Sequence, residues 1–100
     1  MEKIFSENDI KKVWEKGITV QNMNIATLRI DECGAWIEYK QYGNRESQLG
    51  WEIDHIKPIS KGGTNSLENL RPLQWQNNAA KSDEKLICVV TAKGRENNHK

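Results

Sequence analysis

The stretch Trp51–Asp83, which reads WEIDHIKPISKGGTNSLENLRPLQWQNNAAKSD, decides the fold of this chain. It begins with an apolar-flanked run that ends in Asp54-His55. It then passes through a Gly-Gly loop to Asn69 and finishes in a polar segment that carries Asn78. One acid, one imidazole and two amides therefore follow one another along a single stretch. Only folding can bring them together, because they are widely spaced in the sequence.

The same stretch predicts two strands and a helix. Alternating apolar and polar residues over 50–56 are typical of a strand, and Pro58 stops its regular pairing. Leu67–Asn69 predicts one helical turn, residues 70–73 a short returning strand, and residues 74–81 a helix.

The expected side-chain directions follow from these periods. Strand alternation places Asp54 and His55 on opposite sides of the first strand. If both are to serve one site, a bend or bulge is needed at that point. In the helix that follows, we expect Trp75 and Ala79 to face inward.

Outside this stretch, the clearest element is an N-terminal helix. Ser6 can cap it, Asp9 completes a capping box, apolar residues follow at helical spacing, and Gly17 ends the run. Its apolar side predicts that it covers a face of the core. The remaining segments predict a helical turn over 26–30, a strand over 35–39, a last strand over 86–91 and a frayed polar tail over 93–100.

Composition indicates one small domain. The chain has 100 residues, of which 36 % are hydrophobic and 29 % charged, and its net charge of +1 does not by itself indicate a nucleic-acid partner. It contains no apolar run long enough for a membrane helix. Met1–Phe5 lacks an apolar signal region, so we expect a cytoplasmic protein. Cys33 and Cys88 form no C-x-x-C pair, and we expect two buried thiols, because a cytosolic disulfide would be unusual.

Asp54 and Asn78 offer hard oxygen ligands, which suit magnesium in phosphate chemistry, whereas zinc would require more His or Cys. A solvated acid or a helix cap is the plainer interpretation of Asp54 taken alone. His55 is the only histidine inside the expected domain, and it can act as a general base if its other ring nitrogen is held. Asn69 is placed to pin the loop, although turns often contain Asn for ordinary reasons.

Several cations surround these residues and would create a local positive field inside a nearly neutral chain. They are Lys57, Lys61, Arg71 and Lys81, with Arg45 in the preceding polar loop. Arg45 could reach a phosphate, or it could be an ordinary solvated arginine. Trp75 could stack on a base, although a core position is the plainer interpretation.

The order D-H, G-G, L-E-N-L and N-N-A-A-K resembles the HNH endonucleases, whose site is a ββα-metal finger. The resemblance is specific over 50–83 and extends loosely upstream to Asp31. It implies an α+β fold, with a single small domain over 1–92 that adds an N-terminal helix and an extra strand or two to the finger. Residues 93–100 would follow as a flexible tail.

The resemblance also implies a role for each motif residue. His55 would be the general base that activates water, and Asp54 and Asn78 would hold a single divalent metal ion. Asn69 would be structural and would hold the loop that orients the imidazole. Asn77 competes with Asn78 for the ligand role, and Asn78 is preferred because it lies three residues before a lysine. That lysine, Lys81, would then face phosphate, and the expected nucleic-acid contacts are Lys81, Arg71, Lys57 and Arg45.

Two departures from the family pattern shape the remaining expectations. The chain lacks the paired C-x-x-C motifs of many relatives, so we expect no structural zinc, and the core must come from Trp36, Trp51, Trp75 and the last strand. An Asn stands where many relatives have a ligand His, which favours Mg²⁺, with Mn²⁺ also acceptable.

The implied activity is metal-dependent hydrolysis of DNA phosphodiester bonds. We expect contacts to the DNA backbone, weak sequence specificity and no membrane, with targeting by a protein partner or a homodimer. Nicking and double-strand cleavage both remain open. The alternative function is a non-catalytic module on the same fold that binds nucleic acid or protein.

Overall fold

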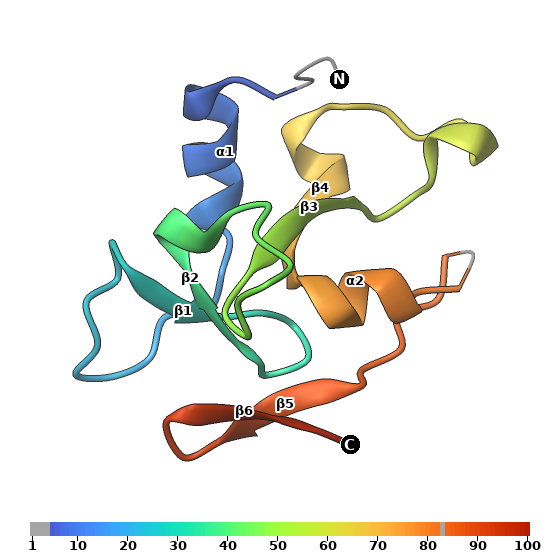
Figure 1. Cartoon of the computed structure of the whole chain (residues 1–100). Coiled ribbons are helices and arrows are strands. Elements are labelled where there is room, and N and C mark those ends of the chain that lie inside the picture. The colour runs from blue at the N-terminus through green and yellow to red at the C-terminus, as the bar shows by residue number, and fades with distance from the viewer. Residues whose placement is uncertain (1–4, 83) are drawn as a thin grey trace.

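The computed structural model describes residues 5–82 and 84–100, and it shows a small α+β domain (Figure 1). Predictions that concern residues 1–4 and Asp83 lie outside the described residues. In chain order the helices and strands are α1 (Glu7–Trp14), β1 (Leu28–Ile30), β2 (Trp36–Glu38), β3 (Trp51–His55), β4 (Leu70–Gln74), α2 (Trp75–Ala80), β5 (Val90–Lys93) and β6 (Glu96–His99). Short 3₁₀ turns cover Tyr39–Gln41, Ile59–Lys61 and Leu67–Asn69. The strands pair as three antiparallel hairpins, β1-β2, β3-β4 and β5-β6.

The N-terminal helix α1 forms as predicted. The Ser6 hydroxyl accepts from the backbone N–H of Asp9, and the Asp9 carboxylate accepts from the backbone N–H of Ser6, which completes the capping box. The side of α1 that carries Ile10, Val13 and Trp14 is buried in the core. None of the helices in the described part of the chain has the length and apolar character needed to span a bilayer.

The β3-β4 hairpin is the centre of the fold, with α1 and α2 packed on opposite faces (Figure 1). Its register runs without interruption from Trp51↔Gln74 to His55↔Leu70. Directly paired residues share a face, so Trp51 and Leu70 face α1 and join its apolar residues. Asp54 faces α2 instead. The predicted strand, helical turn, strand and helix are therefore confirmed, whereas the expected bulge is absent from this register.

Two of the three tryptophans predicted for the core, Trp36 and Trp51, are buried, and Trp14 takes the place expected for Trp75. Trp14 and Trp51 lie at the centre of the core with ring centroids 5.4 Å apart, and Trp36 is also buried. Trp75 is only half-buried, and its indole N–H donates to the carbonyl of Ser47 at 2.9 Å. On α2 it is Asn77 that is fully buried, while Ala79 is exposed, so the predicted inward pair is wrong for Ala79.

Three further predictions outside the centre are corrected. The expected helical turn over 26–30 is largely strand β1, because Leu28–Ile30 pairs with β2. The last apolar strand begins later than expected, at Val90. The predicted frayed tail is instead strand β6, which pairs with β5 through a turn at Gly94, where φ is +63°. The polar composition of the tail predicted no strand. The tail nevertheless forms one, because the backbone of β5 offers hydrogen-bond partners whatever the side chains are.

Cys33 and Cys88 form a disulfide, so the prediction of two buried thiols is wrong. Their Cα atoms lie 5.4 Å apart although 55 residues separate them in sequence. This proximity arises from the packing of β5 beside the 31–35 turn, where the Ala92 N–H donates to the Gly34 carbonyl at 2.9 Å. The thiol prediction rested on the expected cytoplasmic location, because disulfides are typical of oxidising compartments.

Candidate active site

The predicted metal ligands lie on one edge between β3 and α2. Glu52 and Asp54 are two residues apart on the strand and share its α2 face, with a spacing of about 7 Å. Opposite them, Asn78 and Lys81 are three residues apart at the end of α2. The Asn78 amide Nδ2 donates to Glu52 Oε1 at 2.8 Å, and Lys81 Nζ donates to Asp54 Oδ1 at 2.9 Å. Asp54 and Asn78 therefore belong to the same four-residue group.

Asp54 is a buried carboxylate that two cations neutralise. Arg71 Nε donates to Oδ2 at 2.8 Å, and Lys81 Nζ also reaches Oδ2, at 3.1 Å, and the backbone carbonyl of His55. Arg71 further pairs with Glu32 at 3.3 Å. The side chains of Arg71 and Lys81 are only 10 % and 8 % exposed, so here they are committed to Asp54 rather than presented to a phosphate. Sequence reasoning had placed both among the nucleic-acid contacts.

Glu52 and Arg45 form a second ionic contact at this edge. Arg45 Nε and Nη2 donate to the two oxygens of Glu52 at 2.6 and 2.9 Å, and the Arg45 guanidinium lies 5.6 Å from the Trp75 ring centroid. Burial raises the pKa of Glu52, but the hydrogen bonds from Arg45 and Asn78 and the Arg45 charge outweigh it, so this pKa is lowered overall. Glu52 therefore stays ionised near neutral pH. No pattern in the sequence marked it as part of the site.

His55 lies on the other face of β3, at the last residue of the strand. Its ring Nε2 is 2.6 Å from Oδ1 of Asn65, and the Phe5 ring lies beside it, with centroids 6.1 Å apart. An amide oxygen only accepts, so Nε2 carries the proton of the neutral imidazole and Nδ1 keeps a lone pair. Asn65 was not predicted. Its position in a polar loop gives no sequence signal for this contact.

Asn69 pins the loop that follows His55, as predicted. Its Oδ1 accepts from the Lys57 N–H at 2.8 Å, and its Nδ2 donates to the carbonyls of Lys57 and Thr64 at 3.0 and 2.7 Å. The loop is also closely packed at Gly63, where an added Cβ would lie 1.8 Å from the Lys57 carbonyl oxygen. The two ends of the loop are thus held together just beyond the imidazole.

Replacing Asn69 with alanine should destabilise the protein by about 1–3 kcal/mol, because three backbone contacts are lost at once. Equilibrium unfolding in urea measures this effect. Asn98→Ala, which truncates an exposed amide on β6, is the matched control and should keep the stability of wild type. Equal stability of Asn69→Ala and wild type would contradict the pinning role.

Asn77, the competitor for the ligand role, is occupied elsewhere. Its Oδ1 accepts from the N–H groups of Val89 and Val90 at 2.8 Å, and its Nδ2 donates to the Val90 carbonyl at 3.0 Å and to Asp31 at 3.2 Å. It is completely buried. Asn77 thus anchors the last hairpin to α2, while Asn78 faces the β3 edge.

The donor types at this edge, a carboxylate and an amide oxygen, suit a hard divalent cation, although both oxygens of Asp54 already accept from Lys81. Among the described residues, no donor bonds Oδ1 of Asn78, and Asp54 supplies a carboxylate in the same group. The described residues contain no cluster of three or more His, Cys, Asp or Glu that could hold a metal. Two protein oxygens with water and phosphate completing the shell are typical of magnesium, whereas zinc prefers a fuller set of nitrogen and sulfur ligands.

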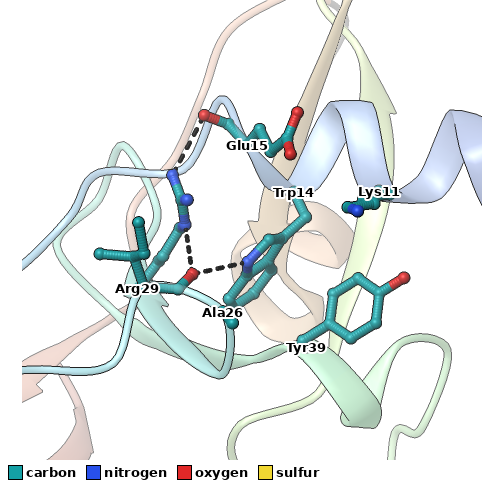
Figure 2. Close-up of a pocket in the computed structure, with 7 residues that line it drawn as sticks. Lys11, Trp14, Glu15, Ala26, Arg29 and Tyr39 are labelled. Carbon is teal, nitrogen blue, oxygen red and sulfur yellow. Dashed lines mark hydrogen bonds between the residues drawn. The ribbon is translucent and has the colours of Figure 1, made fainter.

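A pocket of about 380 Å³ lies away from this edge, between α1 and the turn before β1 (Figure 2). Its polar groups are already used within the fold. Arg29 Nε and the Trp14 indole N–H both donate to the Ile25 carbonyl, at 2.9 and 3.0 Å, and Arg29 also donates to the Glu15 carbonyl at 3.1 Å. None of the predicted site residues lines this pocket. These hydrogen bonds hold the turn before β1 against α1, so we assign the pocket a structural role.

Comparison with known proteins gives one match. The model of a family described as HNH endonuclease matches residues 32–84. This segment runs from the turn before β2 to just beyond α2, and it contains every residue discussed above at the β3 edge and in the following loop. No curated protein and no solved structure matches the chain.

Proposed function

The chain belongs to the HNH endonuclease family, and from this premise we propose that it hydrolyses DNA phosphodiester bonds with one divalent metal ion. What supports the proposal is that α2 contacts one face of β3 through Asn78 on Glu52 and Lys81 on Asp54, next to a histidine whose Nε2 is held. Asp54 and His55 lie on opposite faces of β3, but both are at its end. A phosphate at the end of the strand would be reached from both faces.

In this proposal His55 is the general base. Because Asn65 holds Nε2–H, Nδ1 is the atom that takes a proton from the attacking water. Asn69 contributes by fixing the loop that carries Asn65, so the imidazole keeps one orientation. A neutral imidazole suits this step near neutral pH.

Asp54 and Asn78 would hold the metal ion through Oδ oxygens, with Mg²⁺ preferred and Mn²⁺ acceptable. When bound, such an ion supplies positive charge and Lewis acidity at the scissile phosphate. Arg71 and Lys81 offset the charge of Asp54 and keep the carboxylate in place. Both side chains are buried against Asp54, so in this proposal they hold the carboxylate and do not contact DNA.

The contacts with DNA would be made by exposed cations. Lys57 is exposed beside the loop, and the Arg45 side chain is 55 % exposed despite its ion pair. Contacts of this kind bind backbone phosphates and carry little sequence information. We propose weak intrinsic specificity, with targeting supplied by a protein partner or a second copy of the chain.

The test is cleavage of supercoiled plasmid by the full chain with Mg²⁺, Mn²⁺, Zn²⁺ or EDTA. Nicking with Mg²⁺ and Mn²⁺, and none in EDTA, is expected. Asn78→Ala should lose most of this activity, because one of two protein ligands is removed. Asn98→Ala, which truncates an exposed amide on β6, is the matched control and should cleave like wild type.

Folded protein that binds DNA but cuts with none of these metals would overturn the nuclease proposal in favour of a non-catalytic binding module. In that case the affinity should be unchanged by EDTA and should fall steeply with salt.

A further inference from the structure

Three side chains form a chain of contacts from the surface to the proposed ligand. Arg45 donates to both oxygens of Glu52, at 2.6 and 2.9 Å, and Glu52 Oε1 also accepts from Asn78 Nδ2 at 2.8 Å. The Glu52 side chain is 20 % exposed, so it is partly shielded from water. This series of contacts joins the 43–50 loop to β3 and α2.

The contact with Glu52 decides which way the Asn78 amide points. An asparagine side chain has an acceptor end and a donor end, and a half-turn about its last torsion exchanges them. An ionised carboxylate only accepts, so it selects the donor end. With Nδ2 directed to Glu52, Oδ1 must point away from Glu52, and only Oδ1 can bind a cation.

Hydrogen bonds hold both oxygens of Glu52 in place. Its Oε2 is bonded by Arg45, and its Oε1 by both Arg45 and Asn78. Arg45 in turn lies over Trp75, whose indole N–H is bonded to the Ser47 carbonyl at 2.9 Å. The loop, the strand and the helix therefore fix the carboxylate from three sides.

We propose that Glu52, held by Arg45, is a positioning residue that orients the Asn78 amide so that Oδ1 is presented to a divalent cation. This inference rests on the proposed function, in which Asn78 is a metal ligand. It also gives Arg45 a second role beside the DNA contact proposed above. Partners of this kind, which hold a ligand without touching the metal, typically change metal affinity by about 10–100-fold.

The test is Mn²⁺ binding by the full chain, measured by electron paramagnetic resonance of the free ion. Glu52→Ala should bind Mn²⁺ about 10–100-fold more weakly than wild type. Glu52→Gln keeps an oxygen that can accept from Asn78 Nδ2, so it should restore most of the affinity. Glu46→Ala removes an exposed carboxylate from the same loop and controls for the loss of one negative charge.

A double-mutant cycle shows whether Glu52 acts through Asn78. Once Asn78→Ala has removed the amide, adding Glu52→Ala should weaken Mn²⁺ binding no further. Thermal unfolding of each variant confirms that the comparison is made on folded protein. The side-chain amide resonances of Asn78, recorded without metal, should shift in Glu52→Ala and much less in Glu46→Ala.

Additive losses in the cycle, or Mn²⁺ affinity of Glu52→Ala equal to that of wild type, would overturn the positioning role alone. An equal loss in Glu52→Gln and Glu52→Ala would also overturn it, because the charge of Glu52 would then act on the ion directly. If wild type itself bound no Mn²⁺, the metal assignment in the proposed function would fail first and this inference with it.

Discussion

Replacing His55 with alanine is expected to reduce plasmid nicking by about 10²–10⁴-fold, which corresponds to about 2.7–5.4 kcal/mol of activation free energy. The reason is local. His55 is the one imidazole at the end of β3, and its Nδ1 is free to accept a proton because Nε2 is bonded to Asn65 at 2.6 Å. First-order nicking rates in saturating Mg²⁺ measure the loss.

The variant Asn65→Ala distinguishes the contribution of the base, His55, from that of Asn65, which orients it. That variant keeps the imidazole but frees Nε2, so the rate should fall by less than in His55→Ala. Mn²⁺ affinity should stay at the wild-type value in both, because neither residue is a proposed ligand. A His55→Ala variant that nicks at the wild-type rate would remove His55 from the mechanism while leaving the metal assignment standing.

Removing the disulfide is expected to cause the largest loss of stability. The bond between Cys33 and Cys88 closes a loop with a sequence separation of 55, for which the chain-entropy relation gives about 4 kcal/mol. Small domains are stable by only about 5–15 kcal/mol in total, so this is a large share. Cys33→Ser combined with Cys88→Ser should therefore lower the urea midpoint strongly and can leave the chain unfolded at 37 °C.

A reducing agent provides the control for this prediction. It should destabilise wild type by a similar amount and leave the double serine variant unchanged. Thiol titration of the oxidised wild-type chain in denaturant should find no free thiol. Two titratable thiols, together with equal stability of wild type and the serine variant, would contradict the pairing.

The centre of the fold could be predicted from local patterns. Alternation over 50–56 identified β3, the capping box at Ser6 and Asp9 identified the start of α1, and Asn69 was recognised as the residue that pins the loop. Each of these depends on neighbours within a few residues or across one hairpin. Such signals are present in the sequence itself, because a period or a cap is a local property of the chain.

The remaining assignments depended on partners distant in sequence. Arg71 and Lys81 look like surface cations in the sequence, but the packing of β4 and α2 turns both toward Asp54. Asn65 and Glu52 carry no pattern, and their roles come from contacts with His55 and Asn78. The polar tail became β6 because β5 offered it backbone partners.

The sequence by itself determined the family, the central strand, turn and helix, and the identity of the acid, imidazole and amides that the proposed chemistry uses. Periodicity and motif order are sufficient for this, since both are read along the chain. Only the tertiary structure decided which groups hold those residues: Asn65 on the imidazole, Glu52 on the Asn78 amide, two buried cations on Asp54, and a disulfide across 55 residues. The physical reason is that hydrogen bonds and ion pairs depend on distance in space, which the order of residues does not specify.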